Sequence, residues 1–237
     1  MLTGKVVVII GGSSGIGLST AKAVHDQGAH VVIAGRSQEK LNTAVKTIGN
    51  GVRSFVVEIA NEDSVRTMFD QLDRVDHVFV TASQVVLGAI LDTDIADLKS
   101  TLDSRVWGSY FAAKHAVPKM NDGGSITFMS GSSTWKPSPG GAVAAAAGAA
   151  VESLGRALAL ELSPIRVNTI AAGVIDTPLL DSFFGEKRTA ALDHLMRILP
   201  VKRMGEPQDI AEAALYLMNN KYSTGTVISV DGGILLT

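Results

Sequence analysis

The most informative absence in this 237-residue chain is cysteine, of which there is none. Without thiols the protein has no disulfide framework, no thiolate zinc site and no cysteine nucleophile. Neither sign of charge dominates, because 21 basic residues stand against 23 acidic ones, so the chain lacks the basic surface that nucleic acid requires. The first apolar run, Val6–Ile10, is too short for a signal-peptide core or a membrane span. The sequence therefore predicts a cytoplasmic protein that binds neither nucleic acid nor membranes.

The chain does contain a regular alternation of two patterns. Short runs rich in β-branched residues, bounded by Gly, Asn, Asp or Ser, alternate with segments of helical spacing. Strands that are apolar throughout indicate a parallel sheet covered by helices on both faces, and this length buries roughly 70–75% of the unfolded surface. The prediction is one doubly wound α/β domain over residues 1–237, with strands at Val6–Ile10, Val31–Ala34, Ser54–Ile59, His77–Val80, Ser125–Met129, Ile165–Ile170 and Thr226–Val230.

Apolar residues in the intervening segments recur every three or four positions, which is the spacing of amphipathic helices. Each segment predicts a helix that buries one face against the sheet. The third of these stripes is formed by Ile95, Leu98, Leu102, Val106 and Ser109.

A glycine-rich loop, Gly11-Gly12-Ser13-Ser14-Gly15-Ile16-Gly17, follows the first strand directly and leads into the first helix. A dinucleotide pyrophosphate needs free backbone N–H groups at a helix N-terminus and no side chains in the way. Gly11 would allow the tight turn, Gly15 the close approach of the backbone to the pyrophosphate, and Gly17 the close packing of the helix against the strand. An ordinary strand–helix turn is the alternative, but the strand before and the helix after favour dinucleotide binding.

The glycine spacing, three residues and then one, resembles that of short-chain dehydrogenases/reductases, and in particular proteins like 3-oxoacyl-acyl-carrier-protein reductase. The first residue of that motif is usually Thr in the family, and here it is Ile10. The resemblance implies a single-domain Rossmann fold with a seven-stranded sheet, a nicotinamide cofactor and a small-molecule substrate. It extends over nearly the whole chain through Asp76-His77-Val78, Ile165-Arg166-Val167-Asn168, Gly173 with Thr177-Pro178, and Val230-Asp231-Gly232-Gly233.

Arg36, 19 residues after Gly17, stands at the end of the second strand and bears on the choice of nucleotide. An acidic side chain there would accept from a ribose 2′-hydroxyl, whereas Arg36 offers donors suited to a 2′-phosphate. A charge-assisted contact of about 1.5–3 kcal/mol corresponds to roughly 10–100-fold preference. Because Arg at this place marks NADP(H)-preferring family members, the resemblance implies NADP(H) over NAD(H). The alternative is a solvated arginine at a strand end.

The resemblance assigns further residues to the cofactor site. Ser37 would assist Arg36, and Glu58 with Ile59 falls where the family has an acid and an apolar residue beside the adenine; Glu58 can equally be a charge at a strand end. The remaining predicted cofactor contacts are Ser13, Ser14, Ile16, Ala82, Ser83, Gly173 and Thr177.

At the catalytic positions the chain departs from the family, whose members use Asn, Ser, Tyr and Lys. Counting back from Ile165 places the Tyr position at Ala144 and the Lys position at Gly148, and neither can move a proton. The Ser position falls on Gly131 and the Asn position on Arg105. None of the three tyrosines is followed by Lys four residues later. The sequence therefore predicts that all four usual catalytic side chains are replaced.

Three residues are candidate substitutes. Arg105 could stabilise a developing oxyanion or hold a substrate carboxylate, or it could bond backbone carbonyls where the Asn stood. Ser130 and Ser132 could bond a substrate oxygen or satisfy the backbone. Acid–base catalysis is worth roughly 10²–10⁴-fold, whereas orientation supplies about 7–11 kcal/mol, so hydride transfer to an electron-poor acceptor stays feasible without Tyr and Lys.

The segment around 178–200 corresponds to the family's variable substrate lid. Its apolar residues either form a pocket wall for a partly apolar substrate or pack a surface helix pair. The family implies a homodimer or homotetramer, and the five scattered histidines predict no metal site. The apolar lid residues are Leu179, Leu180, Phe183, Phe184, Leu192, Leu195 and Met196.

Three functions follow from these patterns. The first is an NADP(H)-dependent oxidoreductase with a non-standard active site. The second is a catalytically silent NADP(H)-binding sensor or regulatory subunit, which the loss of the four catalytic side chains favours. The third is a scaffold without cofactor, which requires both the glycine loop and Arg36 to be relics.

Overall fold

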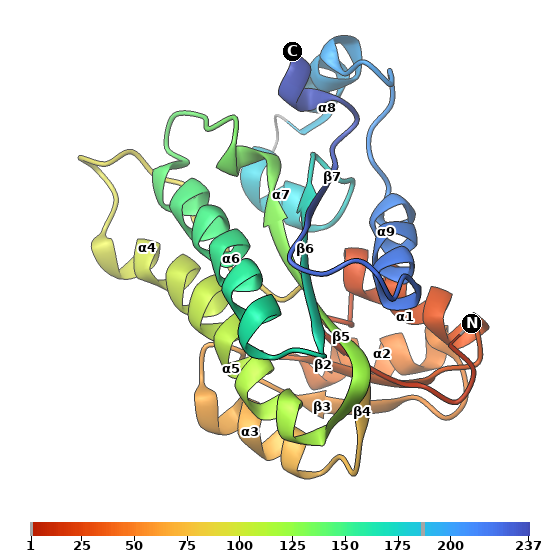
Figure 1. Ribbon diagram of the computed structural model, residues 1–237. Helices are drawn as coiled ribbons and strands as arrows, with labels where there is room; N and C mark the ends of the chain where they lie inside the picture. Colours follow the sequence, from red (N-terminus) through yellow and green to blue (C-terminus); the bar gives the residue numbers. More distant parts are fainter. Residues whose placement is uncertain (1, 186–187) are drawn as a thin grey trace.

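A seven-stranded parallel sheet runs through the centre of the molecule in the order β3-β2-β1-β4-β5-β6-β7 (Figure 1). The computed structural model describes residues 2–185 and 188–237. Every neighbouring pair of strands is parallel, which confirms the predicted single-domain Rossmann-like fold. The strands are β1 Val6–Ile10, β2 His30–Gly35, β3 Arg53–Val56, β4 Val75–Val80, β5 Met120–Gly131, β6 Arg166–Ala172 and β7 Val227–Val230.

Helices cover both faces of this sheet (Figure 1). One face carries α3, α5 and α6, and the other carries α1, α2 and α9, while α7 and α8 stand beyond the sheet with the C-terminal turn. The helices are α1 Gly15–Asp26, α2 Gln38–Ile48, α3 Glu62–Asp70, α4 Ile95–Leu102, the π-helix η1 Asp103–Trp107, α5 Gly108–Ala116, α6 Ala142–Glu161, α7 Leu179–Phe184, α8 Arg188–Ile198 and α9 Pro207–Asn219, with short 3₁₀ turns η2 Val117–Lys119, η3 Ser132–Thr134 and η5 Ile234–Leu236.

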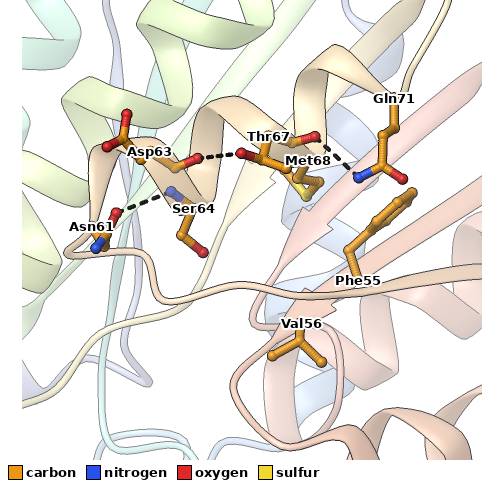
Figure 2. A pocket seen from close by; sticks show the side chains of 8 residues that line it. All are labelled: Phe55, Val56, Asn61, Asp63, Ser64, Thr67, Met68 and Gln71. Carbon is orange, nitrogen blue, oxygen red and sulfur yellow. Dashed lines mark hydrogen bonds between the residues drawn. The ribbon is translucent and has the colours of Figure 1, made fainter.

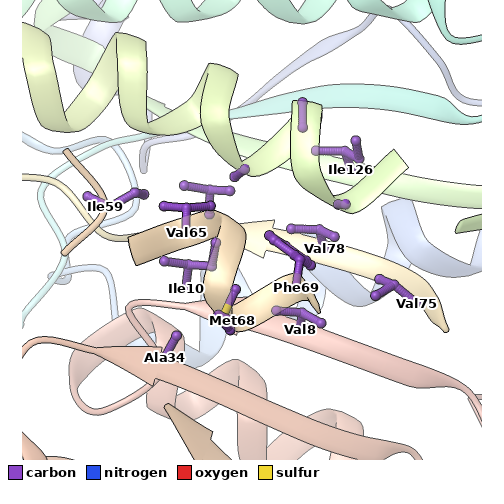
Figure 3. Packing of buried hydrophobic residues seen from close by; sticks show 14 of the residues in the cluster. Val8, Ile10, Ala34, Ile59, Val65, Met68, Phe69, Val75, Val78 and Ile126 are labelled. Atoms are coloured by element: carbon purple, nitrogen blue, oxygen red, sulfur yellow. The ribbon is translucent and has the colours of Figure 1, made fainter. Parts of the chain in front are cut away.

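Two apolar cores result from the alternation of side chains along the strands. Val8 and Ile10 of β1 lie in the core beneath α3, α5 and α6, where Phe69 and Ile126 are also fully buried (Figure 3). Ile9 of the same strand lies in the opposite core, against α1 and α9. Each large apolar side chain buried in this way contributes about 1.5–3 kcal/mol relative to exposure.

Helix α6 has the length and hydropathy of a membrane span, and among the described residues it is the single helix that has both. It packs on β5 and β6, with Val151 and Leu158 in the core. Length and apolar composition are therefore explained by its place on the sheet.

The observed strand ends differ from the predicted ones where residues are buried but are not paired with a neighbouring strand. The strand expected at Ser54–Ile59 ends at Val56, although Val57 and Ile59 beyond it are buried. The N–H of Val57 still donates to the carbonyl of Gly35 on β2, but the paired residues end at Val56. The prediction was too long because Ile59 is buried by packing in the core, not by pairing with β2. The strand expected from Ser125 already begins at Met120, and the other boundaries are the predicted ones or lie within two residues of them.

A π-helical turn interrupts the helix that the third stripe predicts as continuous. The N–H of Gly108 donates to the carbonyl of Asp103, five residues back. A Cβ on Gly108 would lie 2.7 Å from Cγ1 of Ile59, so the helix approaches the segment after β3 more closely than a side chain allows. Such turns are frequent at functional sites, and Arg105 lies in the middle of this one.

Asp76 and Arg166 belong to two of the motifs that carry the resemblance, and both form stabilising contacts at the amino-terminal edge of the sheet. The buried carboxylate of Asp76 accepts hydrogen bonds from Lys5 Nζ at 2.9 Å and from the N–H of Val6 at 2.8 Å. Burial raises the pKa of Asp76, but these bonds outweigh burial and leave it below its usual value. Arg166 donates to the carbonyls of Leu217 (2.6 Å) and Met218 (3.0 Å) and so ties β6 to the end of α9. These residues serve stability.

We predict a pH dependence of stability from His77, whose Nδ1 lies 2.8 Å from Ser125 Oγ. Burial, assisted by the charge of Arg166, lowers the pKa of His77 to about 4. The unfolded chain, with a histidine pKa near 6.5, binds the proton first as pH falls. Stability from this group is therefore full above pH ~6.5 and declines by up to about 3 kcal/mol as the pH falls toward 4.

Urea unfolding at several pH values between 7 and 4 checks this prediction. His77→Asn retains a hydrogen-bonding side chain but does not titrate, so its unfolding free energy should depend less on pH across that interval. His194→Asn, at an exposed position, is the matched control. Equal pH slopes for wild type and His77→Asn would contradict the assignment.

Candidate functional site

The carboxyl ends of the strands meet at one edge of the sheet, and most of the predicted site residues follow them. The strand order reverses direction at β1 and β4, which is the topological switch point where doubly wound proteins bind ligands. The residues placed at or just beyond strand ends are Gly11 after β1, Arg36 after β2, Ala82 after β4, Gly131 at the end of β5 and Gly173 after β6.

The glycines of the first loop are required by close contacts at this switch point. A Cβ on Gly11, whose φ is +100°, would lie 2.3 Å from Thr81 Oγ1. A Cβ on Gly17 would lie 2.2 Å from the carbonyl oxygen of Gly11. Gly15 adopts φ +50°, a region that other residues rarely occupy. No larger residue fits at Gly11 or Gly17 without moving the backbone.

The rest of this loop gathers at the N-terminus of α1. Ser14 is the N-cap residue, with extended backbone and no capping bond from its hydroxyl, and Ser13 packs against the end of β2. The N–H groups of Gly15, Ile16 and Gly17 belong to the first helical turn, where no intrahelical acceptor exists. The structure therefore brings the predicted phosphate-loop residues together with their donors at one helix end.

The residues predicted to choose the nucleotide lie beside this loop. Arg36 is exposed, and Ser37 caps α2 by accepting from the N–H of Lys40 at 3.3 Å. Glu58 is exposed, and its carboxylate accepts from the N–H of Ala60 at 3.2 Å. Ile59 is buried and packs in the core. Arg36 thus has an accessible guanidinium, whereas Ser37 and Glu58 also have local structural roles.

The chain after β6 covers the glycine loop. Gly173 donates its N–H to the carbonyl of Val230 at 2.9 Å, and a Cβ on it would lie 2.6 Å from Cα of Asp231. A Cβ on Gly15 would lie 3.1 Å from Cγ2 of Thr177. Thr177 therefore lies against the glycine loop, and its contact with a cofactor stays a prediction.

The positions that the resemblance gives to Tyr and Lys lie on the buried face of α6. Ala144 and Gly148 are one turn apart, and both are buried. A Cβ on Gly148 would lie 2.1 Å from Thr134 Oγ1, so Thr134 occupies the space that a side chain at 148 would need. The Thr134 hydroxyl is itself buried and has no hydrogen-bond partner among the described residues.

One turn further along α6 is Glu152, a buried carboxylate that is not among the predicted site residues. It accepts from Ser130 Oγ at 2.8 Å and from Trp135 Nε1 at 3.0 Å. Ser130 is therefore turned toward α6 and held there, whereas Ser132 opens η3 and is half-buried. The signal available in the sequence was an acid on the apolar face next to Val151.

Arg105 projects from η1 toward the segment after β4. Its Nη2 donates to Ser83 Oγ at 3.3 Å, and its Nε is buried without a partner. Burial lowers the pKa of this guanidinium. Within residues 2–185 and 188–237 its side chain bonds no backbone carbonyl and has no carboxylate within ion-pair distance. The alternative in which Arg105 bonds carbonyls in place of an Asn finds no support in these contacts.

The three tyrosines and Lys136, which follows η3, have other contacts or lie elsewhere. Tyr110 packs edge-on to Trp107 on the outer side of η1 and α5, and Tyr216 and Tyr222 lie at or beyond the end of α9. Lys136 donates to the carbonyl of Ile234 at 3.1 Å. In the part of the chain that the structure describes, no three His, Asp or Glu side chains gather as metal ligands.

The lid segment forms two helices that contact each other. Leu180 is 6% exposed, whereas Leu179 and Met196 remain 41% and 37% exposed. Residues 186–187 and the side chain of Phe184 lie outside what the structure describes. The exposed surface is compatible with an apolar wall, and the lid assignment stays a prediction.

A hollow of about 340 Å³ lies elsewhere, between the edge strand β3 and α3 (Figure 2). Its polar side chains are used within α3: Asn61 accepts from the N–H of Ser64, and Thr67 donates to the carbonyl of Asp63. Figure 2 shows these bonds running along the helix and not into the hollow. This hollow lies away from the glycine loop and the strand ends that carry the predicted site residues, so it is not the candidate site.

Comparisons with known proteins agree with the geometry. A family model described as enoyl-(acyl carrier protein) reductase matches residues 10–235. The chain is 32% identical to the short-chain dehydrogenase/reductase ucsE of Acremonium sp, over 98% of this chain and 96% of that protein.

Solved structures give the same result. A small-chain dehydrogenase crystallised with NADPH is 36% identical, with a TM-score of 0.86 over 99% of this chain and all of that one. MalC reductase/Diels-Alderase from Malbranchea aurantiaca is 30% identical, with a TM-score of 0.93 over 100% of this chain and 98% of that one. The glycine loop, the parallel sheet and these similarities together establish that the chain belongs to the short-chain dehydrogenase/reductase family of oxidoreductases.

Proposed function

We propose that the protein is a cytoplasmic NADP(H)-dependent oxidoreductase that acts on a carbonyl/alcohol pair or another electron-poor acceptor, with a non-standard active site. The observation that carries this proposal is the phosphate loop at the switch point, with an accessible Arg36 beside it. The 36% identical relative holds NADPH, which supports the same class of cofactor here. When bound, the cofactor supplies a hydride to carbon, and the substrate oxygen takes its proton from water.

The cofactor contacts that we propose are those of the glycine loop, Arg36 and the two covering segments. Gly11, Ser13, Ser14, Gly15, Ile16 and Gly17 would hold the pyrophosphate, with Thr177 and Gly173 above it. Arg36 and Ser37 would hold the 2′-phosphate, and Glu58, Ile59, Ala82 and Ser83 would border the adenine and the ribose.

The reaction must proceed without the family's proton donor. Neither Ala144 nor Gly148 can donate, and Ser130 is engaged by Glu152. Arg105 is a largely buried cation at the carboxyl edge with one weak contact among the described residues, and a fixed cation there stabilises developing negative charge. Ser132 is a further hydroxyl at this edge. We assign catalysis to electrostatics and orientation, which suffices for acceptors whose reduction needs little protonation in the transition state.

A catalytically silent NADP(H)-binding sensor or regulatory subunit is the second candidate. The contact of Gly148 with Thr134 favours it, because the space for a family lysine is filled. Turnover with an electron-poor acceptor separates the two functions, since a sensor binds the cofactor without consuming it.

We propose a small, partly apolar substrate and a homodimer or homotetramer. Exposed apolar residues on the α4–α6 side of the molecule support self-association, notably Trp107 at 53% exposure and Leu160 at 85%.

The first prediction here concerns the nucleotide. Arg36→Ala should weaken NADPH binding by about 10-fold or more and leave the affinity for NADH nearly unchanged. The reason is that Arg36 contacts the 2′-phosphate, which NADPH has and NADH lacks. Calorimetric titration of both cofactors measures it, with Arg66→Ala on α3 as control. An equal loss for both cofactors would remove Arg36 from the 2′-phosphate site.

The second prediction concerns turnover. The wild-type protein should oxidise NADPH in the presence of 1,4-naphthoquinone faster than the uncatalysed mixture, and Arg105→Ala should lower that rate by about 100-fold without loss of NADPH affinity. NADPH absorbance reports the rate, and circular dichroism confirms folding. An unchanged rate in Arg105→Ala would exclude Arg105 from catalysis, and a wild-type rate no faster than background would support the sensor.

The third prediction concerns the space at Gly148. Gly148→Ala should destabilise the protein by about 1–3 kcal/mol, because its Cβ would overlap the Thr134 hydroxyl. In a Thr134→Ala background the same change should become neutral or stabilise by about 0.5–1 kcal/mol, which is the helix-propensity difference. Urea unfolding measures the cycle, and Ala146→Gly on the exposed face of α6 calibrates propensity. A penalty that persists without the Thr134 hydroxyl would contradict the contact.

A further inference from the structure

The five N–H donors of Arg105 are incompletely used, because one contact, from Nη2 to Ser83, is formed among the described residues. Nε has no partner, and Nη2 has one 3.3 Å contact with the neutral hydroxyl of Ser83. In arginine the N–H of Nε and one N–H of Nη2 point in the same direction. Their spacing matches the two oxygens of a carboxylate, which accepts two parallel hydrogen bonds from such an edge.

Nearby acids do not neutralise this cation. On its own turn Asp103 is exposed and forms no ion pair among the described residues. Glu152 on the adjoining α6 is occupied by Ser130 and Trp135. A partly desolvated cation without a counter-charge is costly, and an anionic ligand would remove that cost.

A second buried donor without a partner lies on another segment that packs against α6. The hydroxyl of Thr134 is buried without a partner. Thr134 belongs to η3 and Arg105 to η1, and both segments pack against α6. Buried donors without partners are uncommon, so each of these two calls for an explanation.

The rim of the same edge is apolar. Leu87, Trp135 and Leu179 follow β4, β5 and β6 and are 45%, 61% and 41% exposed. Trp135 is held in place through its indole N–H on Glu152, so its ring is a fixed surface. A ligand whose charged end meets Arg105 can therefore rest an apolar body on this rim.

We infer that Arg105 binds the carboxylate of the substrate through Nε and Nη2, and that the substrates are carboxylic acids with an apolar body. This inference rests on the proposed function for its meaning as substrate recognition. A carboxylate is charged before the reaction begins, so its recognition acts on ligand binding itself. A role restricted to a developing oxyanion would not change the binding of an unreactive acid.

The test is binding of benzoate and benzamide to the protein saturated with NADP⁺. Both probes are planar aromatic molecules of nearly the same shape, and only benzoate carries a charge. Calorimetry should show benzoate binding about 10–100-fold more tightly to the wild-type protein. Arg105→Gln should abolish that preference. Arg105→Lys keeps the charge but not the fork and should reduce the preference about 10-fold. Arg66→Gln is the matched control and should leave it intact.

Several outcomes would overturn the inference. Equal binding of the two probes to the wild type would do so, as would a preference that survives in Arg105→Gln. If Arg105→Gln does not fold, an unchanged preference in Arg105→Lys would be decisive against the guanidinium fork. The NADP⁺ titration that precedes the probes tests the proposed function separately. Should NADP⁺ not bind, the same probes are titrated into the free protein, and the carboxylate preference is judged there.

Discussion

The constraint on which the site depends is the close approach of the first loop to the end of β4. Gly11 and Gly17 leave no room for a Cβ between the loop backbone and Thr81, and this contact closes the junction between β1 and β4. Because the strand order reverses at that junction, the helix N-terminus, the end of β2 and the end of β4 all face the same space. The positions of Arg36 and Ser83 relative to the phosphate loop follow from it.

Residues at the amino-terminal edge of the sheet serve stability, and residues at the carboxyl edge serve the proposed function. At the amino-terminal edge the charged groups have partners: Asp76 is bonded to Lys5 and Val6, and Arg166 to the carbonyls that end α9. At the carboxyl edge Arg105 and Thr134 retain donors without partners. Arg166 also has a buried Nε without a partner, but its Nη1 and Nη2 donate to three carbonyls, whereas Arg105 has a single hydroxyl contact within the described part of the chain. This difference points to a binding role for Arg105.

Periodicity in the sequence was enough to predict the fold, because central strands buried on both faces show it plainly, as Val6–Ile10 does. The glycine loop was likewise readable, since its spacing is local. The π turn at Arg105 could not be read, because it accompanies the contact of Gly108 with Ile59, which is distant in sequence. Glu152 was missed for the same reason: its partners Ser130 and Trp135 come from another segment, and the apolar helix pattern concealed it.

The proposed site keeps a positive charge while giving up its proton donor. On the assignment that we propose, the position of the family's lysine on α6 is Gly148, and Thr134 fills the space beside it. The under-partnered cation is then Arg105 on η1. A guanidinium keeps its proton at any physiological pH, so it can attract an anion but donates protons poorly. Chemistry at such a site must rely on attraction and orientation. A substrate that brings its own negative charge and an already electron-poor carbon meets both requirements.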